Sequence, residues 1–182
     1  MPSKTDFILF SGGAAGAESK FGATAEAFEI EEVNFTFENH KIQRERGVRV
    51  LNHEELKKGD ISLDYVSTLM KREYPDTKLF KKILQTIWYQ INNAQQIFVV
   101  GVILDDNTVK GGTGWGAEFA KICNKKLYVF DQDKGTWNFW ENNSWTKVET
   151  PKITETHFCG TGTRFLNDKG IEAIESLFKN SF

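Results

Sequence analysis

Short apolar segments that suit β-strands alternate along the chain with longer segments whose apolar residues recur at helical spacing. Gln96–Gly101 is a nearly continuous apolar run, which is typical of a strand buried on both faces of a parallel sheet. The segment after Pro75 carries an apolar stripe at intervals of four, formed by Leu79, Ile83, Ile87 and Ile91. Regular alternation of this kind favours a parallel sheet with helices on both of its faces.

The remaining elements continue this alternation over the whole length of 182 residues. We expect further strands at Asp6–Phe10, Val33–Phe37, Lys126–Phe130 and Ile153–Phe158. Helices are expected at Gly16–Ile30, Ile61–Tyr74, Gly114–Asn124 and around Ile171–Phe178. Aromatic and polar residues alternate on both sides of Asn142-Asn143, which predicts an exposed hairpin over Trp137–Val148. The sequence therefore predicts one α/β domain, residues 1–182, with a Rossmann-like three-layer α/β/α fold, a mainly parallel sheet and a late β-hairpin insertion.

Composition excludes several classes of protein. The 25 acidic and 23 basic residues leave a net charge of −2, so the protein as a whole does not attract the negatively charged backbone of a nucleic acid. No apolar run approaches the roughly 20 residues that span a bilayer, and the N-terminal segment lacks the pattern of a secretory signal. Cys123 and Cys159 are too few for a disulfide framework or a zinc site, and the three histidines show no ligand spacing. We expect a soluble, cytoplasmic protein without a membrane partner.

Three expected strands run into a glycine-rich turn that leads toward a helix: Ser11–Gly16, Gly111–Gly116 and Gly160–Thr163. In an open parallel sheet such turns lie at the carboxyl edge, where ligands bind at a topological switch point. Glycine lets the backbone approach an anion, and a helix start supplies unpaired N–H groups and the positive end of the helix dipole. Glycines that merely make tight turns are the structural alternative.

The three turns together predict a phosphate or nucleotide site. Its expected binding residues are Ser11, Gly12, Gly13, Gly111, Gly112, Thr113, Gly114, Trp115, Asp131, Gly160, Thr161, Gly162, Thr163 and Arg164. None of the turns carries the Gly-Lys-Ser/Thr of a nucleoside-triphosphate loop, and the spacing of Gly12, Gly13 and Gly16 does not fit the dinucleotide fingerprint. A conventional NAD dehydrogenase or ATPase is therefore disfavoured.

No cofactor is required by this pattern, although a bound nucleotide fits it. Asp105 and Asp106 follow the central strand and offer weak support for Mg²⁺ held through phosphates; an Asp-Asp-Asn run is more often only a turn. We expect no metal site built from protein ligands alone.

Two of the glycine segments resemble the signature regions of the SLOG superfamily of Rossmann-like nucleotide-binding domains. These are Ser11-Gly-Gly-Ala-Ala-Gly-Ala-Glu18 and Gly111-Gly-Thr-Gly-Trp-Gly-Ala-Glu118. Within that group, the LOG phosphoribohydrolases carry the motif Pro-Gly-Gly-x-Gly-Thr-x-x-Glu. Gly111, Gly112, Gly114 and Glu118 match it in register, whereas Lys110 replaces the proline and Trp115 replaces the threonine. The resemblance implies a phosphate held on the Gly111–Gly114 backbone.

Glu118 is the expected catalytic residue if the protein is an enzyme. The resemblance to LOG enzymes implies that this glutamate assists cleavage of the N-glycosidic bond of a nucleoside monophosphate-like substrate. Such a reaction needs a carboxylate that stabilises an oxocarbenium-like centre or activates water. The LOG arginine on the preceding helix has no clear counterpart, since Lys81 and Lys82 are the nearest cations and Arg72 lies further upstream. A glutamate early in a helix also interacts favourably with the helix dipole, which is the structural alternative.

Other residues of the expected site have structural alternatives too. Trp115 suits stacking on a base, a lid over the site or burial against the sheet. Arg164 suits a phosphate clamp or an ion pair with a surface acid. Asp131 suits ribose hydroxyls or the capping of a turn. Cys159 is more readily a buried thiol than a nucleophile.

Three functions follow from the sequence. The first is binding of a nucleotide or a nucleotide-derived phosphorylated ligand, as a carrier or sensor. The second is N-glycosidic hydrolysis through Glu118. The third, a nucleic-acid-binding module, rests on family analogy and on the basic residues between Lys41 and Arg49, which more readily form a solvated loop. The hairpin tryptophans Trp137, Trp140 and Trp145 suit hairpin packing or a homodimer contact better than base stacking.

Overall fold

The computed structural model describes residues 2–182 and contains one sheet of eight strands. The strands are β1 (Ile8–Ser11), β2 (Glu31–Phe37), β3 (Val48–Leu51), β4 (Gln96–Gly101), β5 (Lys126–Asp131), β6 (Thr136–Glu141), β7 (Ser144–Val148) and β8 (His157–Gly162). The α-helices are α1 (Ala17–Ala27), α2 (His53–Lys57), α3 (Asp60–Met70), α4 (Lys78–Asn92), α5 (Thr113–Ile122) and α6 (Asp168–Ser181), and Lys4–Asp6 forms a 3₁₀ turn.

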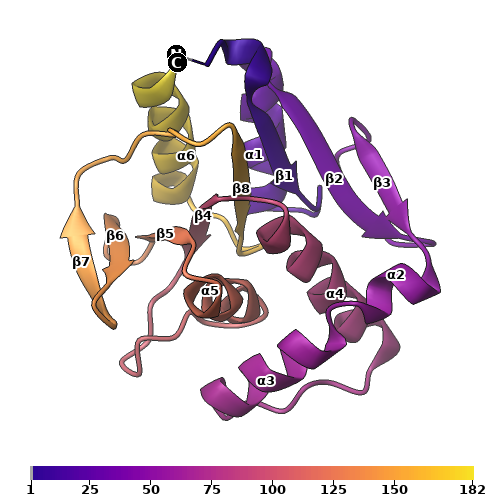
Figure 1. The fold of residues 1–182 in the computed structure, drawn as a ribbon. Helices are drawn as coiled ribbons and strands as arrows, with labels where there is room; N and C mark the ends of the chain where they lie inside the picture. The colour runs from indigo at the N-terminus through magenta and orange to yellow at the C-terminus, as the bar shows by residue number, and fades with distance from the viewer. Residues whose placement is uncertain (1) are drawn as a thin grey trace.

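The strand order is β3-β2-β1-β8-β4-β5-β6-β7. All pairs from β3 to β5 in this order are parallel, whereas β6 pairs antiparallel with both β5 and β7. The last strand of the chain, β8, lies between β1 and β4 (Figure 1). The chain moves outward from β1 in one direction and from β4 in the other, so the sheet has its topological switch point around β8.

Helices cover both faces of the sheet, as predicted. One core packs α1 and α6 against side chains such as Phe98 and Phe158. A second core packs α3, α4 and α5 against the other face, where Ile97 and Val99 point. Because consecutive residues of β4 point to opposite faces, its fully buried run Gln96–Gly101 supplies both cores. The predicted Rossmann-like three-layer α/β/α fold is confirmed.

The predicted hairpin is confirmed and continues the sheet beyond β5. Asn142 and Asn143 both adopt positive φ, at 50° and 57°, which is the backbone conformation that a tight two-residue hairpin requires. Trp140 and Trp145 face each other across the two strands with ring centroids 4.9 Å apart. The indole of Trp145 also donates to the carbonyl of Asn107 at 3.0 Å, so the hairpin is tied to the rest of the fold.

Several boundaries differ from the sequence predictions, three of them near the candidate site or at the edge of the sheet. The strand expected at Ile153–Phe158 is β8, which begins only at His157, because Gln96 fixes the preceding segment as coil: its Oε1 accepts from the amide of Thr154 at 2.8 Å. The short edge strand β3 contains Arg49, the last of the basic residues that are expected to form a solvated loop. The helix expected over Ile61–Tyr74 ends at Met70, where Lys71 takes a left-handed conformation.

No helix within residues 2–182 combines the length and the apolar character needed to cross a membrane.

Candidate functional site

The carboxyl ends of β1, β8 and β4 lie side by side at the switch point. The amide of Ala17, at the start of α1, donates to the carbonyl of Thr163 at 2.9 Å. The amide of Thr163 in turn donates to the carbonyl of Val100 at 2.9 Å. A Cβ placed on Gly101 would lie 3.7 Å from Thr113, the first residue of α5. The three segments with expected binding residues therefore follow one edge of the sheet.

The first segment, Ser11–Gly16, is closed by its own neighbours. The hydroxyl of Ser11 donates to the carbonyl of Gly160 at 2.7 Å in the buried interior. Gly12 and Gly13 are buried, and the carbonyl of Gly13 accepts from the amides of Gln43 and Arg44. The connection between β2 and β3 thus lies over this turn and covers the face that a ligand would approach.

An internal carboxylate, that of Glu18, occupies this turn. Its Oε2 accepts from the amide of Ala14 at 3.1 Å. Its Oε1 accepts from the hydroxyl of Thr161 at 2.9 Å and from the amide nitrogen of Gln90 at 3.1 Å. We call Ala14, Glu18, Gln90 and Thr161 the Glu18 network. It joins the first glycine turn, β8 and α4 where α/β proteins of this topology commonly bind ligands.

Burial is the dominant influence on the acid–base chemistry of this network. It raises the pKa of Glu18 above its ordinary value, while the hydrogen bonds from Ala14, Thr161 and Gln90 act in the opposite direction. Burial, with a smaller contribution from Glu18, also raises the pKa of Cys159 well above its ordinary value. Cys159 is fully buried and not disulfide-bonded, in agreement with the structural alternative for this thiol.

The third segment is not a loop, which corrects the sequence prediction. Gly160, Thr161 and Gly162 belong to β8. The ring of Phe21 packs where a Cβ of Gly160 would lie, and the backbone of Val100 occupies the same position at Gly162. These two glycines therefore allow α1 and β4 to approach β8 closely. The turn after the strand begins at Thr163, whose hydroxyl accepts from the amide of Phe165 at 3.1 Å.

Arg164 is exposed beside this turn. Its guanidinium lies 5.2 Å from the ring centroid of Phe165, and the structure shows it in no ion pair with another residue between 2 and 182. The alternative of a salt bridge with a surface acid is therefore absent from the described residues, and Arg164 stays a predicted phosphate contact.

The second segment, Gly111–Thr113, is the open one. Gly111 has φ of 73°, and a Cβ placed on it would meet nothing within 4 Å. Among the hydrogen bonds of residues 2–182, none uses the amides of Gly111 or Gly112, which precede the N-terminus of α5. Arg72 stabilises the turn, because its guanidinium donates to the carbonyls of Val109 and Gly111 at 3.0 and 3.1 Å.

Trp115 lies beneath this segment rather than at its surface. It is 4% exposed, and its ring meets that of Phe80 edge to face and lies 5.8 Å from the guanidinium of Arg72. The indole nitrogen is buried and has no hydrogen-bond partner within residues 2–182. The side chain of Trp115 is therefore buried, which is the structural alternative to stacking on a base.

Glu118 faces the hairpin. Its Oε2 lies 3.0 Å from the ammonium group of Lys121, one turn further along α5. That ammonium group also donates to the carbonyl of Asn107 and lies 3.9 Å from the ring centroid of Trp140. The carboxylate is thus held in an ion pair at the contact between α5 and the hairpin.

The remaining acidic candidates cap turns. The carboxylate of Asp131 is buried and accepts from the amides of Asp133 and Lys134, each at 3.1 Å. Asp106 accepts from the amide of Thr108 at 3.0 Å and from its hydroxyl, and these bonds lower the pKa of Asp106. Residues 2–182 contain no group of three or more His, Cys, Asp or Glu side chains arranged to hold a metal ion.

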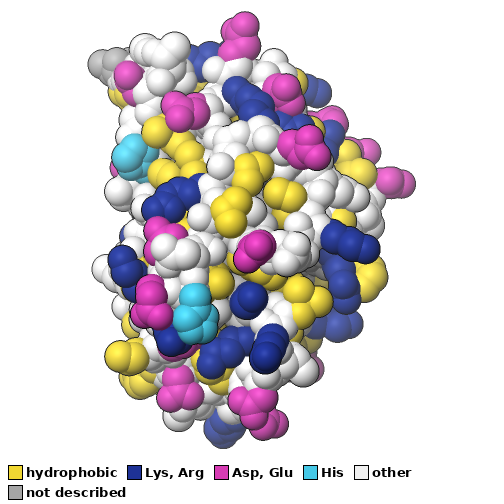
Figure 2. Space-filling model, turned by 90° about the vertical axis from the view of Figure 1, so that its right-hand side faces the viewer, with side chains coloured by type: hydrophobic (Ala, Val, Ile, Leu, Met, Phe, Trp, Pro, Cys, Tyr) yellow, Lys and Arg dark blue, Asp and Glu magenta, His cyan; other side chains and the backbone are white. Residues whose placement is uncertain are grey.

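The basic residues between Lys41 and Arg49 are largely paired. Arg44 and Arg46 both contact the buried carboxylate of Glu32, and Arg49 pairs with Glu55 at 2.9 Å. Figure 2, which faces the β3 side of the molecule, shows basic and acidic side chains intermixed with hydrophobic ones rather than a continuous basic surface. This charge pattern gives the nucleic-acid hypothesis no support.

Sequence reasoning missed the Glu18 network and the clamp made by Arg72. Glu18 carried a signal, because it ends the tripeptide Gly16-Ala17-Glu18 that recurs as Gly116-Ala117-Glu118. Gln90 on α4 and Arg72, which follows the end of α3, carried no such signal, because they are far from these turns in the sequence. The chain matches no protein-family model, no curated protein and no solved structure.

Proposed function

We propose that this α/β protein binds a phosphorylated small molecule, a nucleotide or a nucleotide-derived compound, as a carrier or sensor. The contact with the anion is made by the Gly111–Thr113 turn at the N-terminus of α5. The observation that carries the proposal is the pair of amides of Gly111 and Gly112, which have no hydrogen-bond partner among residues 2–182, next to the exposed Gly111, where an added Cβ would meet nothing within 4 Å. Amides at a helix N-terminus are suited to a phosphate because they donate hydrogen bonds and share the positive end of the dipole.

Neighbouring residues support the same ligand chemistry. Lys110, which directly precedes the turn, is exposed, and Arg72 adds a second positive charge behind it. The resemblance of Gly111–Glu118 to the LOG signature favours a nucleotide over other phosphate esters. The first glycine turn takes a secondary part in the proposal, because Glu18 and the Gln43–Arg44 backbone already occupy it.

Substitution at Gly112 tests the proposal. This residue has φ of −61° and ψ of −30°, a conformation that any residue type adopts, and a Cβ placed on it would lie 3.1 Å from the ring of Phe80. We expect Gly112→Asp to weaken the binding of AMP at least about tenfold, because a fixed carboxylate competes for the same amides and repels phosphate. Gly112→Ala is the matched control, since it adds the same Cβ near Phe80 without the charge.

Calorimetric titration of AMP, ADP-ribose and related dinucleotides gives the readout. Equal affinity of the Asp and Ala variants would place the anion site elsewhere. The same incubations test hydrolysis through Glu118. Free base that is released by the wild type and not by Glu118→Gln would replace the binding proposal with the enzymatic one.

A further inference from the structure

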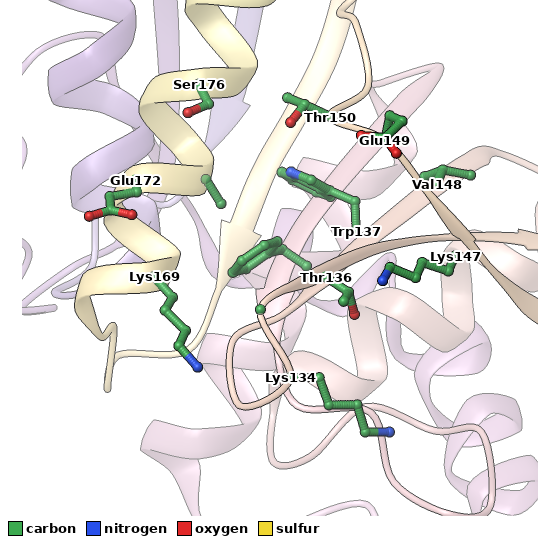
Figure 3. Close-up of a pocket in the computed structure, with 13 residues that line it drawn as sticks. Lys134, Thr136, Trp137, Lys147, Val148, Glu149, Thr150, Lys169, Glu172 and Ser176 are labelled. Carbon is green, nitrogen blue, oxygen red and sulfur yellow. The ribbon is translucent and has the colours of Figure 1, made fainter.

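A hollow with a volume of about 530 Å³ lies between α6 and the β6–β7 hairpin, away from the glycine turns. Figure 3 shows α6 on one side of the hollow and the hairpin strands on the other. Its size is in the range of sites for small organic ligands. The hollow continues along α6 into a second one, and Glu149, Thr150 and Ser176 line both.

The floor of the hollow is apolar. Phe130, Trp137 and Ala173 line it and belong to the core beneath α1 and α6, and Val148 packs against that core. An apolar floor below a polar rim suits a ligand with an apolar part and a charged end.

Three lysines from three separate elements stand on the rim. Lys134 belongs to the turn after β5, Lys147 to β7 and Lys169 to α6. Figure 3 shows Lys147 and Lys169 leaning into the hollow from opposite sides. Neither forms an ion pair with an acidic side chain within residues 2–182, and Lys134 has only a distant contact, 3.9 Å from Asp131. The rim therefore holds positive charge that no close ion pair among residues 2–182 neutralises.

The two acidic residues at the hollow reduce this charge without cancelling it. Glu149 and Glu172 make no ion pair with the rim lysines. The carboxylate of Glu172 points to the outer side of α6, away from the hairpin (Figure 3).

Lys169 lies at an unfavourable position with respect to the dipole of α6, although its ammonium group donates to the carbonyl of Asp133 at 3.4 Å. It is the second residue of α6, where its charge meets the positive end of the helix dipole. Local rules of stability are most often broken where a residue serves a function. A bound anion would relieve this repulsion, because it would lie between Lys169 and the other lysines.

We propose that this hollow binds a small organic molecule that carries a dianionic phosphate group and an apolar portion. The phosphate lies among Lys134, Lys147 and Lys169, and the apolar portion lies against Phe130 and Trp137. The hydroxyls of Thr150 and Ser176 are the additional donors on the rim. This site is separate from the Gly111–Thr113 turn and does not depend on the function proposed there.

Nuclear magnetic resonance of the ¹⁵N-labelled full chain tests the proposal, with phenyl phosphate and inorganic phosphate as probes. We expect phenyl phosphate to shift the amides of Lys134–Trp137, Lys147–Thr150 and Lys169–Ser176, and to bind more tightly than inorganic phosphate because its ring covers the apolar floor. The double substitution Lys147→Gln/Lys169→Gln is expected to weaken phenyl phosphate about tenfold. The matched control is Lys41→Gln/Lys58→Gln, which makes the same change in net charge at exposed positions elsewhere.

Three outcomes would overturn the proposal. One is the absence of saturable shifts up to about 10 mM phenyl phosphate. A second is shifts confined to Gly12, Gly111 and their neighbours, which would assign all anion binding to the glycine turns. The third is equal weakening by the two double substitutions, which would show a response to net charge alone.

Discussion

The tripeptide Gly-Ala-Glu occurs twice, at residues 16–18 and 116–118, and the two copies end in carboxylates with different surroundings. Glu18 is buried and accepts hydrogen bonds from three separate segments. Glu118 is partly exposed and pairs with Lys121 on its own helix. The same three residue types thus build a junction of the fold in one place and a local ion pair in the other.

The position of the helix start explains this difference. Gly16 is the N-cap of α1, so Glu18 lies in the first turn, where its carboxylate reaches back to the amide of Ala14. Gly116 is the fourth residue of α5, so Glu118 lies beyond the first turn and its side chain meets Lys121. The carboxylate of Glu18 also takes the place of an external anion at its turn, whereas the amides of Gly111 and Gly112 stay free of such a partner within residues 2–182.

Substitution of the glycines that form the two turns is expected to have the largest effect on the free energy of unfolding. Gly16 and Gly111 both have positive φ, at 93° and 73°. A Cβ on Gly16 would lie 2.4 Å from Cα of Arg164, so Gly16→Ala requires the backbone to move and is expected to cost about 4 kcal/mol or more. Gly111→Ala meets open space and is expected to cost about 1 kcal/mol, from the backbone conformation alone. Urea unfolding of both variants measures the difference, and similar losses would contradict it.

Alanine substitutions of the two glutamates are expected to differ by a smaller amount in the free energy of unfolding that they cost. Glu18→Ala leaves Thr161 and Gln90 with buried donors that lack an acceptor, and we expect a loss of about 3 kcal/mol in the free energy of unfolding. Glu118→Ala removes one ion pair but leaves Lys121 its hydrogen bond to the carbonyl of Asn107, and is expected to cost about 1 kcal/mol. The measurement is again urea unfolding at neutral pH. If Glu118→Ala lowers the free energy of unfolding as much as Glu18→Ala does, Glu18 does not join separate parts of the fold more strongly than Glu118 does.

The sequence predicted the strands and helices well because their signals are local. The buried run Gln96–Gly101 and the stripe on α4 became a central strand and a packed helix with nearly the expected ends. The pair Asn142-Asn143 predicted the hairpin because few residue types tolerate positive φ at both positions. The prediction failed at β8, where Gln96, about 60 residues earlier in the chain, holds residues 152–155 as coil.

The site was harder to predict because glycine has several uses. At Gly160 and Gly162 it makes room for Phe21 and for the backbone of Val100, and at Gly111 it supplies positive φ beside open space. The residue type is glycine at all three positions, so the sequence alone does not distinguish these uses. Only the tertiary structure distinguishes a close approach of two elements from an open turn. The role of Gln90 in the Glu18 network was equally hidden, because it depends on α4 crossing the edge of the sheet.

The smallest expected effect concerns the pH dependence of the free energy of unfolding, which Glu18 is expected to change. Burial raises the pKa of Glu18 in the folded protein above its ordinary value of 4.5. The folded state therefore binds this proton more tightly than the unfolded chain, so protonated Glu18 contributes stability below that value and the contribution is lost as the pH rises through the folded-state pKa. Cys159, the neighbouring titratable group, stays a thiol over this range, because burial raises its pKa well above 9.

Glu18→Gln abolishes this titration. We expect the free energy of unfolding of the wild type, relative to Glu18→Gln, to decrease as the pH rises from about 4 to about 7. Urea unfolding at five or so pH values, with circular dichroism as the readout, gives both curves. Parallel curves for wild type and Glu18→Gln would mean that Glu18 titrates alike in the folded and unfolded states, and the carboxylate would then be solvated rather than enclosed by Ala14, Gln90 and Thr161.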